Sequence, residues 1–547
     1  MVNTFNPADL KFFLPEFALA GAIIALFIGD LLVTEETKKR SVLTFVAFGG
    51  LALSALGLMT INGQSTTIFS GQLSIDALGI MFKWLFIAIG AASLYTSTLS
   101  KELPDRHMGE YFILLVAIIF GMFLMASAND MLMVYLGLEM VSILSFAMAG
   151  YRSHDKRSSE AALKYVVYGG AASGLMLFGI SLLYGLLGTT ELSAMHMALA
   201  QWAEAHFAAS ASAGGSAFPV TLLTSIMFIF AGVGYKIAVV PFHMWSPDVY
   251  EGAPTPFSAF LSVGPKAAGF ALLLRVFVGI FVPFSTDGVV SPRGFVSDAD
   301  GFMTVVMELP LPAVLGIVAA LTMTVGNLAA IAQNNVKRLL AYSSIAHAGY
   351  LLMGFVVLSE SAVHAVILYT IFYYLMNLGA FTVAQAVRDQ TGGEMIEDFQ
   401  GLGAREPLLG VAMVIFLLSL TGLPPLAGFI GKFYIFASVL ERGGFWLTSL
   451  AIVGVVNSAI SLYYYMRIVK TMYLSEPKTA EPLGAHRGYV LVASVLAVPT
   501  LILGIYWSPL SATVRDNIQL HRGEVMQAML DEAESKSSGH ALKIQER

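Results

Sequence analysis

The sequence predicts an all-α integral membrane protein with about 14 transmembrane helices, and three observations support this fold class. Hydrophobic residues make up 57% of the 547 residues and charged residues only 12%, whereas charged residues are about 25% of a typical soluble domain. Apolar runs long enough to cross a bilayer, which takes about 20 residues, recur along almost the whole chain. Strand-like alternation of apolar and polar residues is not seen between them.

The apolar runs divide the chain into fourteen expected membrane spans, and a charged tail with modest amphipathic character follows them at 511–547. The spans are 12–33, 42–61, 74–99, 109–128, 130–151, 161–187, 219–241, 254–284, 311–333, 338–358, 361–387, 407–440, 446–473 and 488–508.

The net charge of −6 and the absence of cysteine exclude several function classes. The charge is spread over loops and chain ends, so it indicates no nucleic-acid partner. Without thiolates the chain holds no iron–sulfur cluster, c-type haem or disulfide, and the electrons of any redox system would travel through other subunits. The N-terminus lacks a basic segment followed by a small-residue cleavage site, so the first apolar run is expected to be a retained helix.

Basic residues between the spans predict the orientation, because cytoplasmic loops carry an excess of Lys and Arg. If the chain starts outside, the short outer loops carry little beyond Arg293 and Arg442. Both termini are therefore expected on the outer side. The inner loops then carry Lys38, Lys39, Arg40, Lys101, Arg106, Arg152, Lys156, Arg157, Lys337, Arg338, Arg388, Arg405, Lys470, Lys478 and Arg487.

Two outer connections, 188–218 and 285–310, are long. In the first, apolar residues from Leu192 to Trp202 recur at helical spacing. The pattern predicts a short helix, which either lies on the membrane surface or packs on the bundle.

The arrangement of the spans indicates an internal duplication with two interrupted helices. The fourth span of each half, the seventh and twelfth overall, is broken near its middle, at Pro241 and in the Gly- and Pro-rich run 422–428. Interruptions at corresponding positions of two halves are typical of inverted-repeat transporters. We therefore expect two inverted five-helix repeats, 109–284 and 311–473, between an N-terminal three-helix unit, 1–108, and a last helix with an outer tail, 488–547.

Four ionisable residues, Glu139, Lys236, Lys266 and Lys432, lie deep inside apolar runs. Each charge at the middle of a spanning helix costs about 2.5–3.5 kcal/mol, so four of them cost roughly 10 kcal/mol. A chain keeps such groups where partners or internal water offset the cost and function needs them. A line of such groups bridged by water is what a proton path requires, although purely structural ion pairs are the alternative.

Three further residues are weaker candidates for the same path. Lys164 follows Glu160 by four residues near an inner helix end, so an i,i+4 pair or a side chain extended to the interface also explains it. Lys337 adjoins Arg338 at an inner end and could be a topology anchor. His347 is ten residues further along, about 15 Å deeper at about 1.5 Å per residue, which favours a relay over a core histidine.

The prolines at the two breaks indicate where water could reach the buried lysines. Proline removes an N–H donor and leaves carbonyl groups without helical partners. Unwound backbone at membrane depth is tolerated only where it faces protein or water. Pro241 lies five residues after Lys236, and Pro425 lies seven residues before Lys432, so each break adjoins a buried lysine.

Three long motifs give the chain a resemblance to a known family. They are Pro241–Pro256 (PFHMWSPDVYEGAPTP), Lys337–His347 (KRLLAYSSIAH) and Gly422–Phe433 (GLPPLAGFIGKF). With them the chain resembles the antiporter-like subunits of respiratory complex I, over roughly residues 10–510. Within that family the chain most resembles the N-type branch. Three features favour this branch: the PDVYEGAP motif, the lysine at 432 and the end of the chain shortly after the last span.

The resemblance implies roles for three residues of the first repeat. Lys236 matches the central proton-holding lysine of the broken seventh span. Glu139 matches the glutamate of the fifth span that modulates the proton affinity of this lysine, and Lys164 matches a sixth-span lysine that helps to set the electrostatics. Separation or approach of Glu139 and Lys236 would then load and unload a proton.

The remaining candidates match positions that continue the path. Lys266 matches the connecting lysine of the eighth span, Lys337 and His347 match tenth-span positions that link two half-channels, and Lys432 matches the exit lysine of the twelfth span.

The resemblance also implies the surroundings of the chain. It implies a proton-translocating subunit of NADH:quinone oxidoreductase in the bacterial cytoplasmic (inner) membrane, whose partners are the lipid bilayer and other membrane-arm subunits. FMN, iron–sulfur clusters and quinone are expected in partner subunits, with no cofactor or metal bound by this chain. The alternatives are a subunit of a multisubunit Na⁺/H⁺ antiporter, a subunit of a hydrogenase- or ferredoxin-linked complex, and a membrane scaffold with inert ion pairs.

Overall fold

The computed structural model describes residues 7–33, 35–212, 219–281, 310–357, 359–477 and 481–518. Over these residues the chain is helical except for turns and one antiparallel hairpin, β1 (Thr66–Ile68) and β2 (Leu73–Ile75). This hairpin was not predicted, because strands of three residues are too short to show alternation. The third helix consequently begins at Ala77 and not at residue 74.

The helices follow the predicted spans with shifted ends. In chain order they are η1 (Pro7–Phe13), α1 (Leu14–Leu32), α2 (Glu36–Ile61), α3 (Ala77–Leu99), η2 (Asp105–His107), α4 (Met108–Ser127), α5 (Met131–Ala149), α6 (Lys156–Leu187), α7 (Leu192–Ser212), α8 (Val220–Ile237), α9 (Trp245–Gly252), α10 (Thr255–Phe281), α12 (Leu311–Ile331), α13 (Val336–Phe355), α14 (Glu360–Thr391), η3 (Ile396–Phe399), α15 (Leu402–Arg405), α16 (Pro407–Thr421), α17 (Ala427–Arg442), α18 (Phe445–Leu474) and α19 (Arg487–Ile505).

Within the described ranges, 12 helices are long and apolar enough to cross a membrane. The chain is therefore a multi-pass membrane protein. Two predicted spans are not among the twelve. The span at 338–358 falls on α13, where Lys337, Arg338 and His347 make the helix more polar. The span at 407–440 is divided between α16 and α17, which have 15 and 16 residues and are each too short to cross alone.

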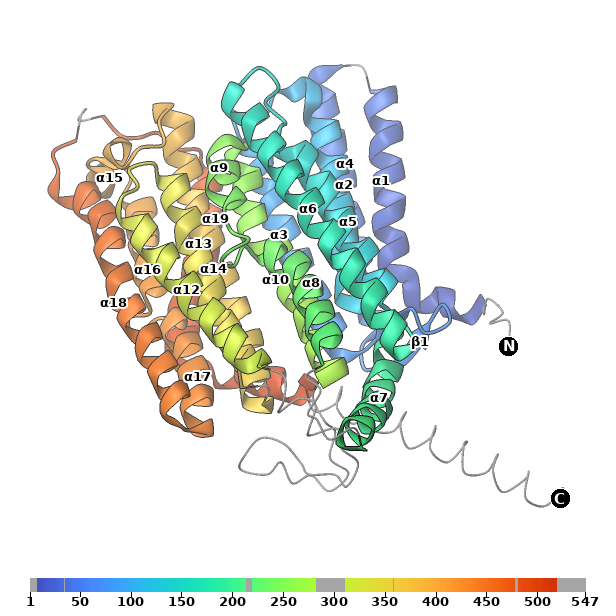
Figure 1. Ribbon diagram of the computed structural model, residues 1–547. Helices are drawn as coiled ribbons and strands as arrows, with labels where there is room; N and C mark the ends of the chain where they lie inside the picture. Colours follow the sequence, from blue (N-terminus) through green and yellow to red (C-terminus); the bar gives the residue numbers. More distant parts are fainter. Residues whose placement is uncertain are drawn as a thin grey trace.

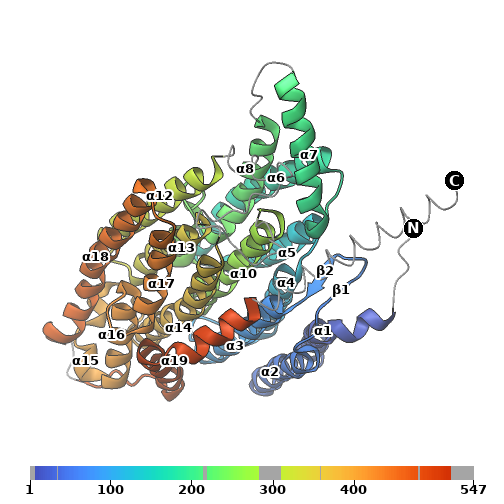
Figure 2. The ribbon, with the colours of Figure 1, turned by 90° about the horizontal axis from the view of Figure 1, so that it is seen from below.

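The helices form one bundle with two buried helices at its centre (Figures 1 and 2). Helices α1 to α6 lie on one side of the bundle and α12, α16 and α18 on the other. Between them α10 packs against α14, and almost all residues in the apolar windows of these two helices are buried. Side chains on α10 and α14 therefore face protein and not lipid.

Basic residues predicted for inner loops lie at one end of the bundle. The described chain begins at Pro7 and ends at Ile518 at one end, the lower end in Figure 1, which we call the terminal face. The opposite end, which we call the loop face, carries the turns after α3, α5 and α14. At the loop face lie Lys101, Arg152 and Arg388, three of the basic residues predicted for inner loops. Which side of the membrane the loop face is on stays a prediction.

The predicted helix in the first long connection is α7, at the terminal face (Figure 2). Its residues Leu192, Met195 and Leu199 are buried, and the helix packs against α10. It is thus a helix packed on the bundle, the second of the two interpretations. The connection 285–310 and the tail from 519 lie outside the described residues.

Candidate functional site

The first interrupted helix consists of α8, an unwound stretch at 238–244 that contains Pro241, and α9. Groups of the protein satisfy the polar backbone around this break. Val240 N donates to Thr322 Oγ1 on α12 at 3.0 Å, and Trp245 Nε1 donates to the Tyr235 carbonyl at 3.1 Å. Lys236 occupies the last turn of α8, where the partial negative charge of a helix C-terminus favours a cation.

Lys236 is buried between α8 and α5. Its Nζ donates to Ser142 Oγ at 3.1 Å. Glu139 lies one turn earlier on α5, is half-buried, and is near enough to act electrostatically on Lys236. The Glu139 carboxylate accepts a hydrogen bond from Ser173 on α6. The structure thus brings Lys236 within the electrostatic reach of Glu139 and bonds it to Ser142, which was not predicted.

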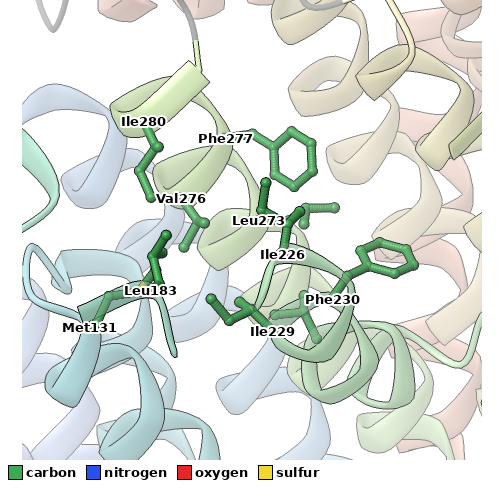
Figure 3. Close-up of a pocket in the computed structure, with 10 residues that line it drawn as sticks. Met131, Leu183, Ile226, Ile229, Phe230, Leu273, Val276, Phe277 and Ile280 are labelled. Atoms are coloured by element: carbon green, nitrogen blue, oxygen red, sulfur yellow. The ribbon is translucent and has the colours of Figure 1, made fainter. Parts of the chain in front are cut away.

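An apolar cavity lies between α5, α6, α8 and α10, along the part of α8 that precedes Lys236 (Figure 3). It is lined by Ile229 and Phe230 of α8 and by Leu273 and Phe277 of α10, among other apolar side chains. Its volume is about 20 Å³. Space of that size could hold about one water, but a buried water needs two or more polar partners, and this lining offers none. The cavity therefore offers a water no polar partner along the part of α8 that precedes Lys236.

Lys266 continues the line of buried groups along α10. It is buried, donates to the Ser344 carbonyl at 2.7 Å and also contacts the Ser344 hydroxyl. One turn further, Gly269 faces α8 so closely that an added Cβ would lie 2.6 Å from Ile237 and 3.6 Å from Cγ of Lys236. The stem of Lys236 therefore packs one helical turn away from Lys266.

His347 lies on α13, one turn after Ser344, and is buried. Its Nδ1 is 2.6 Å from Tyr369 Oη and its Nε2 is 3.4 Å from Tyr465 Oη. Lys266 and Lys432 are both near enough to act electrostatically on the ring. His347 thus stands between the lysine of the first repeat and the lysine of the second.

Lys432 lies on α17, the second half of the second interrupted helix, which consists of α16, the stretch 422–426 and α17. Its Nζ donates to the carbonyls of Leu420 at 3.0 Å and Thr421 at 2.9 Å, and to Ser458 Oγ at 2.7 Å. Carbonyls in the last turn of a helix have no partner within the helix. The Nζ of the lysine at each break thus lies at the C-terminal end of a half-helix, that of Lys236 at the end of α8 and that of Lys432 at the end of α16.

A polar cluster beside Lys432 was missed by the sequence analysis. Lys432 Nζ is 4.4 Å from the centre of the Tyr350 ring. Asn327 Nδ2 donates to Tyr350 Oη at 3.3 Å and to Asn457 Oδ1 at 3.2 Å, and Tyr464 Oη donates to Asn327 Oδ1 at 2.9 Å. The signal was available, because Asn327 and Asn457 each interrupt an otherwise apolar span.

The two candidates near the loop face have partners that the sequence did not indicate. Lys337 is buried, and its Nζ lies 3.1 Å from Glu394 Oε1. Lys164 makes the i,i+4 pair with Glu160 at 2.7 Å and a second contact with Asp248 of α9 at 2.6 Å.

Glu394 is ionised under all ordinary conditions. Burial alone would raise the pKa of this loop carboxyl, but the charge of Lys337, a hydrogen bond from Asn335 and the charge of Arg388 together lower the pKa to about 2. Lys337 therefore faces a constant negative charge.

Two more buried ion pairs lie outside the predicted path. Lys83 Nζ of α3 is 2.6 Å from Glu16 Oε1 of α1, with both side chains buried. Arg275 of α10 holds Asp76 through two hydrogen bonds of 2.7 Å. Both pairs join the N-terminal unit internally or to the first repeat, and the sequence analysis counted neither.

Replacing Gly422 with alanine is expected to destabilise the protein and to impair Lys432. Gly422 has φ +90, and an added Cβ would lie 2.9 Å from Cδ of Lys432. An L-residue at positive φ costs about 1 kcal/mol or more, and the contact adds to that cost. Gly443→Ala is the matched control, because Gly443 also has positive φ but an added Cβ there meets nothing within 4 Å.

Thermal unfolding in detergent and proton pumping in vesicles test this prediction. Both variants should lose stability, and Gly422→Ala alone should lose pumping. Equal pumping in the two variants would contradict a role for the packing around Lys432.

Comparisons with known proteins agree with this architecture. Residues 128–291 and 300–461 match the family described as NADH:quinone oxidoreductase/Mrp antiporter, transmembrane. NADH-quinone oxidoreductase subunit N of Anaeromyxobacter sp. (strain Fw109-5) is 47% identical over 525 residues, which covers 95% of this chain and 98% of the relative.

Two solved structures share the fold. One is a chain of respiratory complex I from Thermus thermophilus with bound aureothin, at a TM-score of 0.71 and 28% identity, which covers 91% of this chain and 98% of that one. The other is a chain of the Mrp complex from Dietzia sp. DQ12-45-1b, at a TM-score of 0.74 and 18% identity, which covers 94% and 99%. By its matched segments and its full-length relatives, this chain belongs to the NADH:quinone oxidoreductase/Mrp antiporter family of membrane subunits.

Proposed function

We propose that this chain is the N-type antiporter-like subunit of a bacterial NADH:quinone oxidoreductase and that it carries protons across the membrane. The observation that supports this most is the line of buried ionisable groups between the two interrupted helices. Lys236, Lys266, His347 and Lys432 are all buried, and each is bonded to hydroxyl or carbonyl groups of neighbouring helices.

The proposed path includes all seven candidate residues. Protons reach Lys236 from the loop face, because the cavity on its terminal side is apolar. They pass from Lys236 through Lys266 and His347 to Lys432 and leave toward the terminal face. Glu139 and Lys164 set the charge around the first lysine, and Lys337 does so at the start of α13.

Changes in nearby charge drive proton transfer along the path. Electron transfer to quinone in partner subunits, which also hold FMN and iron–sulfur clusters, alters the charge at one edge of the bundle. Two unit charges about 4 Å apart at an effective dielectric constant of about 20 interact with about 4 kcal/mol. At about 1.36 kcal/mol per tenfold change, approach or separation of Glu139 and Lys236 changes proton binding about a thousandfold.

We further propose a topology of fourteen crossings. The pairs α8 with α9 and α16 with α17 each form one crossing, and α13 forms another. The two inverted repeats then correspond to 109–284 and 311–473, with 1–108 as an N-terminal unit and 488–547 as the last helix and tail. The loop face is cytoplasmic and both termini are periplasmic, because the predicted inner basic residues described above gather at the loop face.

The higher identity to subunit N supports NADH:quinone oxidoreductase over an Mrp antiporter as the assembly. A native gel of solubilised membranes, blotted for this chain and stained for NADH dehydrogenase activity, tests this assignment. Migration of the chain with the activity stain is the expected result, whereas migration with other membrane subunits alone would contradict the proposal.

Glu139→Gln is expected to reduce proton pumping strongly. The amide keeps an oxygen that accepts from Ser173 but removes the charge that acts on Lys236. Proton uptake into inverted vesicles at a matched rate of NADH oxidation measures the effect. Glu110→Gln is the control, because Glu110 is exposed at the loop face and pairs with His107 alone among the described ion pairs. Unchanged pumping in Glu139→Gln would exclude the modulating role.

A further inference from the structure

Three charged side chains from separate elements hold one short turn at the loop face. The turn, residues 252–255, joins α9 to α10. Arg152 Nη2 donates to the Gly252 carbonyl at 2.9 Å, and Lys337 Nζ donates to the Ala253 carbonyl at 2.8 Å. Glu102 Oε2 accepts from Thr255 N at 2.8 Å. The turn is thus fixed by charge at three of its four residues.

The same three side chains belong to one chain of ion pairs. Glu102 Oε1 lies 3.2 Å from Arg152 Nη1 and 3.0 Å from Arg388 Nη2. Glu394 Oε1 lies 2.9 Å from Arg388 Nε and 3.1 Å from Lys337 Nζ. We call this sequence of alternating charges, Arg152, Glu102, Arg388, Glu394 and Lys337, the loop-face ion-pair chain.

Glu102 is the buried centre of this chain. Its side chain has an exposed fraction of 0%, whereas both arginines are 19% exposed. Oε1 makes no hydrogen bond of good geometry, so charge alone holds it between the two guanidinium groups. A carboxylate buried in this way is costly unless it is paired, so its contacts respond to changes in the charges beside it.

Arg388 and Glu394 each pair with two oppositely charged residues, so the two ion pairs of each residue compete. Arg388 divides its attraction between Glu102 and Glu394, and one oxygen of Glu394 divides its attraction between Arg388 and Lys337. A longer distance between Glu394 and Lys337 would leave Glu394 free to draw Arg388 away from Glu102. Lys337 also donates to the Ala253 carbonyl, so a displacement of its Nζ reaches the turn directly.

We propose that Glu102 is a positioning residue of the proton path, which couples the ion pair between Lys337 and Glu394 to the position of the turn between α9 and α10. The inference rests on the proposed proton-carrying function and extends it. Helix α9 follows the break beside Lys236, and α10 carries Lys266. A change at Lys337 therefore reaches the two lysines of the first repeat through Arg388, Glu102 and this turn.

The test compares a single and a double variant in vesicles that carry the whole complex. Glu102→Gln keeps an oxygen for Thr255 N but removes the charge, and it leaves Arg388 free to draw Glu394 from Lys337. Pumping per NADH oxidised is expected to fall about fivefold, the effect of losing an ion pair worth about 1 kcal/mol. Adding Arg388→Gln removes the competing cation and is expected to restore most of the pumping.

The restoration separates coupling from a structural role, since two structural defects would add. Glu394→Gln, which leaves all three bonds to the turn in place, is expected to lower pumping like Glu102→Gln. Glu110→Gln serves as the loop-face control.

Each outcome decides one question. The coupling is overturned, and the proposed function left intact, if Glu102→Gln pumps like the wild type or if the double variant loses still more pumping. The same conclusion follows if Glu102→Gln fails to assemble while Glu394→Gln pumps like the wild type. If Lys236→Ala in the same preparation pumps normally, the proposed function itself fails, and the coupling fails with it.

Discussion

Vesicles whose complex carries Lys236→Ala are expected to oxidise NADH with little proton pumping through this subunit. Lys236 is buried at the C-terminal end of α8 and is bonded to Ser142. Alanine removes the protonatable group, and the remaining hydroxyl of Ser142 cannot hold a proton near neutral pH. A pH-sensitive dye in inverted vesicles measures pumping, with NADH oxidation followed in parallel.

Lys470→Ala is the matched control for this experiment. Lys470 is exposed near the loop-face end of α18, so its loss should leave pumping unchanged. Lys236→Arg adds a second comparison, because an arginine keeps the charge but does not release its proton. Pumping at the wild-type level in Lys236→Ala would refute the proton path and revive the membrane scaffold.

Arg275→Ala is expected to prevent stable assembly of the chain. The arginine holds the buried Asp76 carboxylate through two hydrogen bonds and also contacts the Ala126 carbonyl. Removing one partner of a buried pair costs about 3–5 kcal/mol, because the other charge stays buried without compensation. The amount of chain in membranes, measured by immunoblot, and its thermal unfolding in detergent report the loss.

The double variant Asp76→Asn with Arg275→Met is expected to recover much of that stability. Replacement of a whole buried pair is often neutral, and the asparagine can still cap α3 at Gly79 N, where Asp76 now accepts at 2.7 Å. Lys38→Ala is the control, because its pair with Glu35 is exposed and worth about 0–1 kcal/mol. A stable Arg275→Ala protein would mean that this pair does not hold α10 to α3.

The sequence was informative where a residue conflicted with its surroundings. Lys236, Lys266 and Lys432 stand in apolar runs where a cation is expensive, so their positions predicted burial, and the structure buries all three. The breaks beside Lys236 and Lys432 could be predicted for a similar reason, because proline cannot continue a helix.

The sequence was less informative where the partner lies far along the chain. Glu102 and Glu394 read as ordinary loop residues, and only the fold brings them to Arg152 and Lys337. Glu16 lies near the start of a predicted span, where a carboxylate is usually solvated, so the sequence did not indicate it as the partner of Lys83, which stands inside an apolar run. Helix ends were shifted because helices continue past the hydrocarbon core, as α6 does from Lys156.

The burial of α10 and α14 has a consequence for how the chain is made. Among the twelve candidate spans they are the two least apolar, and they touch other helices on nearly every side. Contact with lipid acyl chains is less favourable for these two helices than for the more apolar outer helices. Each would have to make that contact while its neighbouring helices are still being synthesised. We therefore expect these two segments to leave the insertion machinery late, together with the helices that enclose them, so that biogenesis proceeds by whole repeats and not one hairpin at a time.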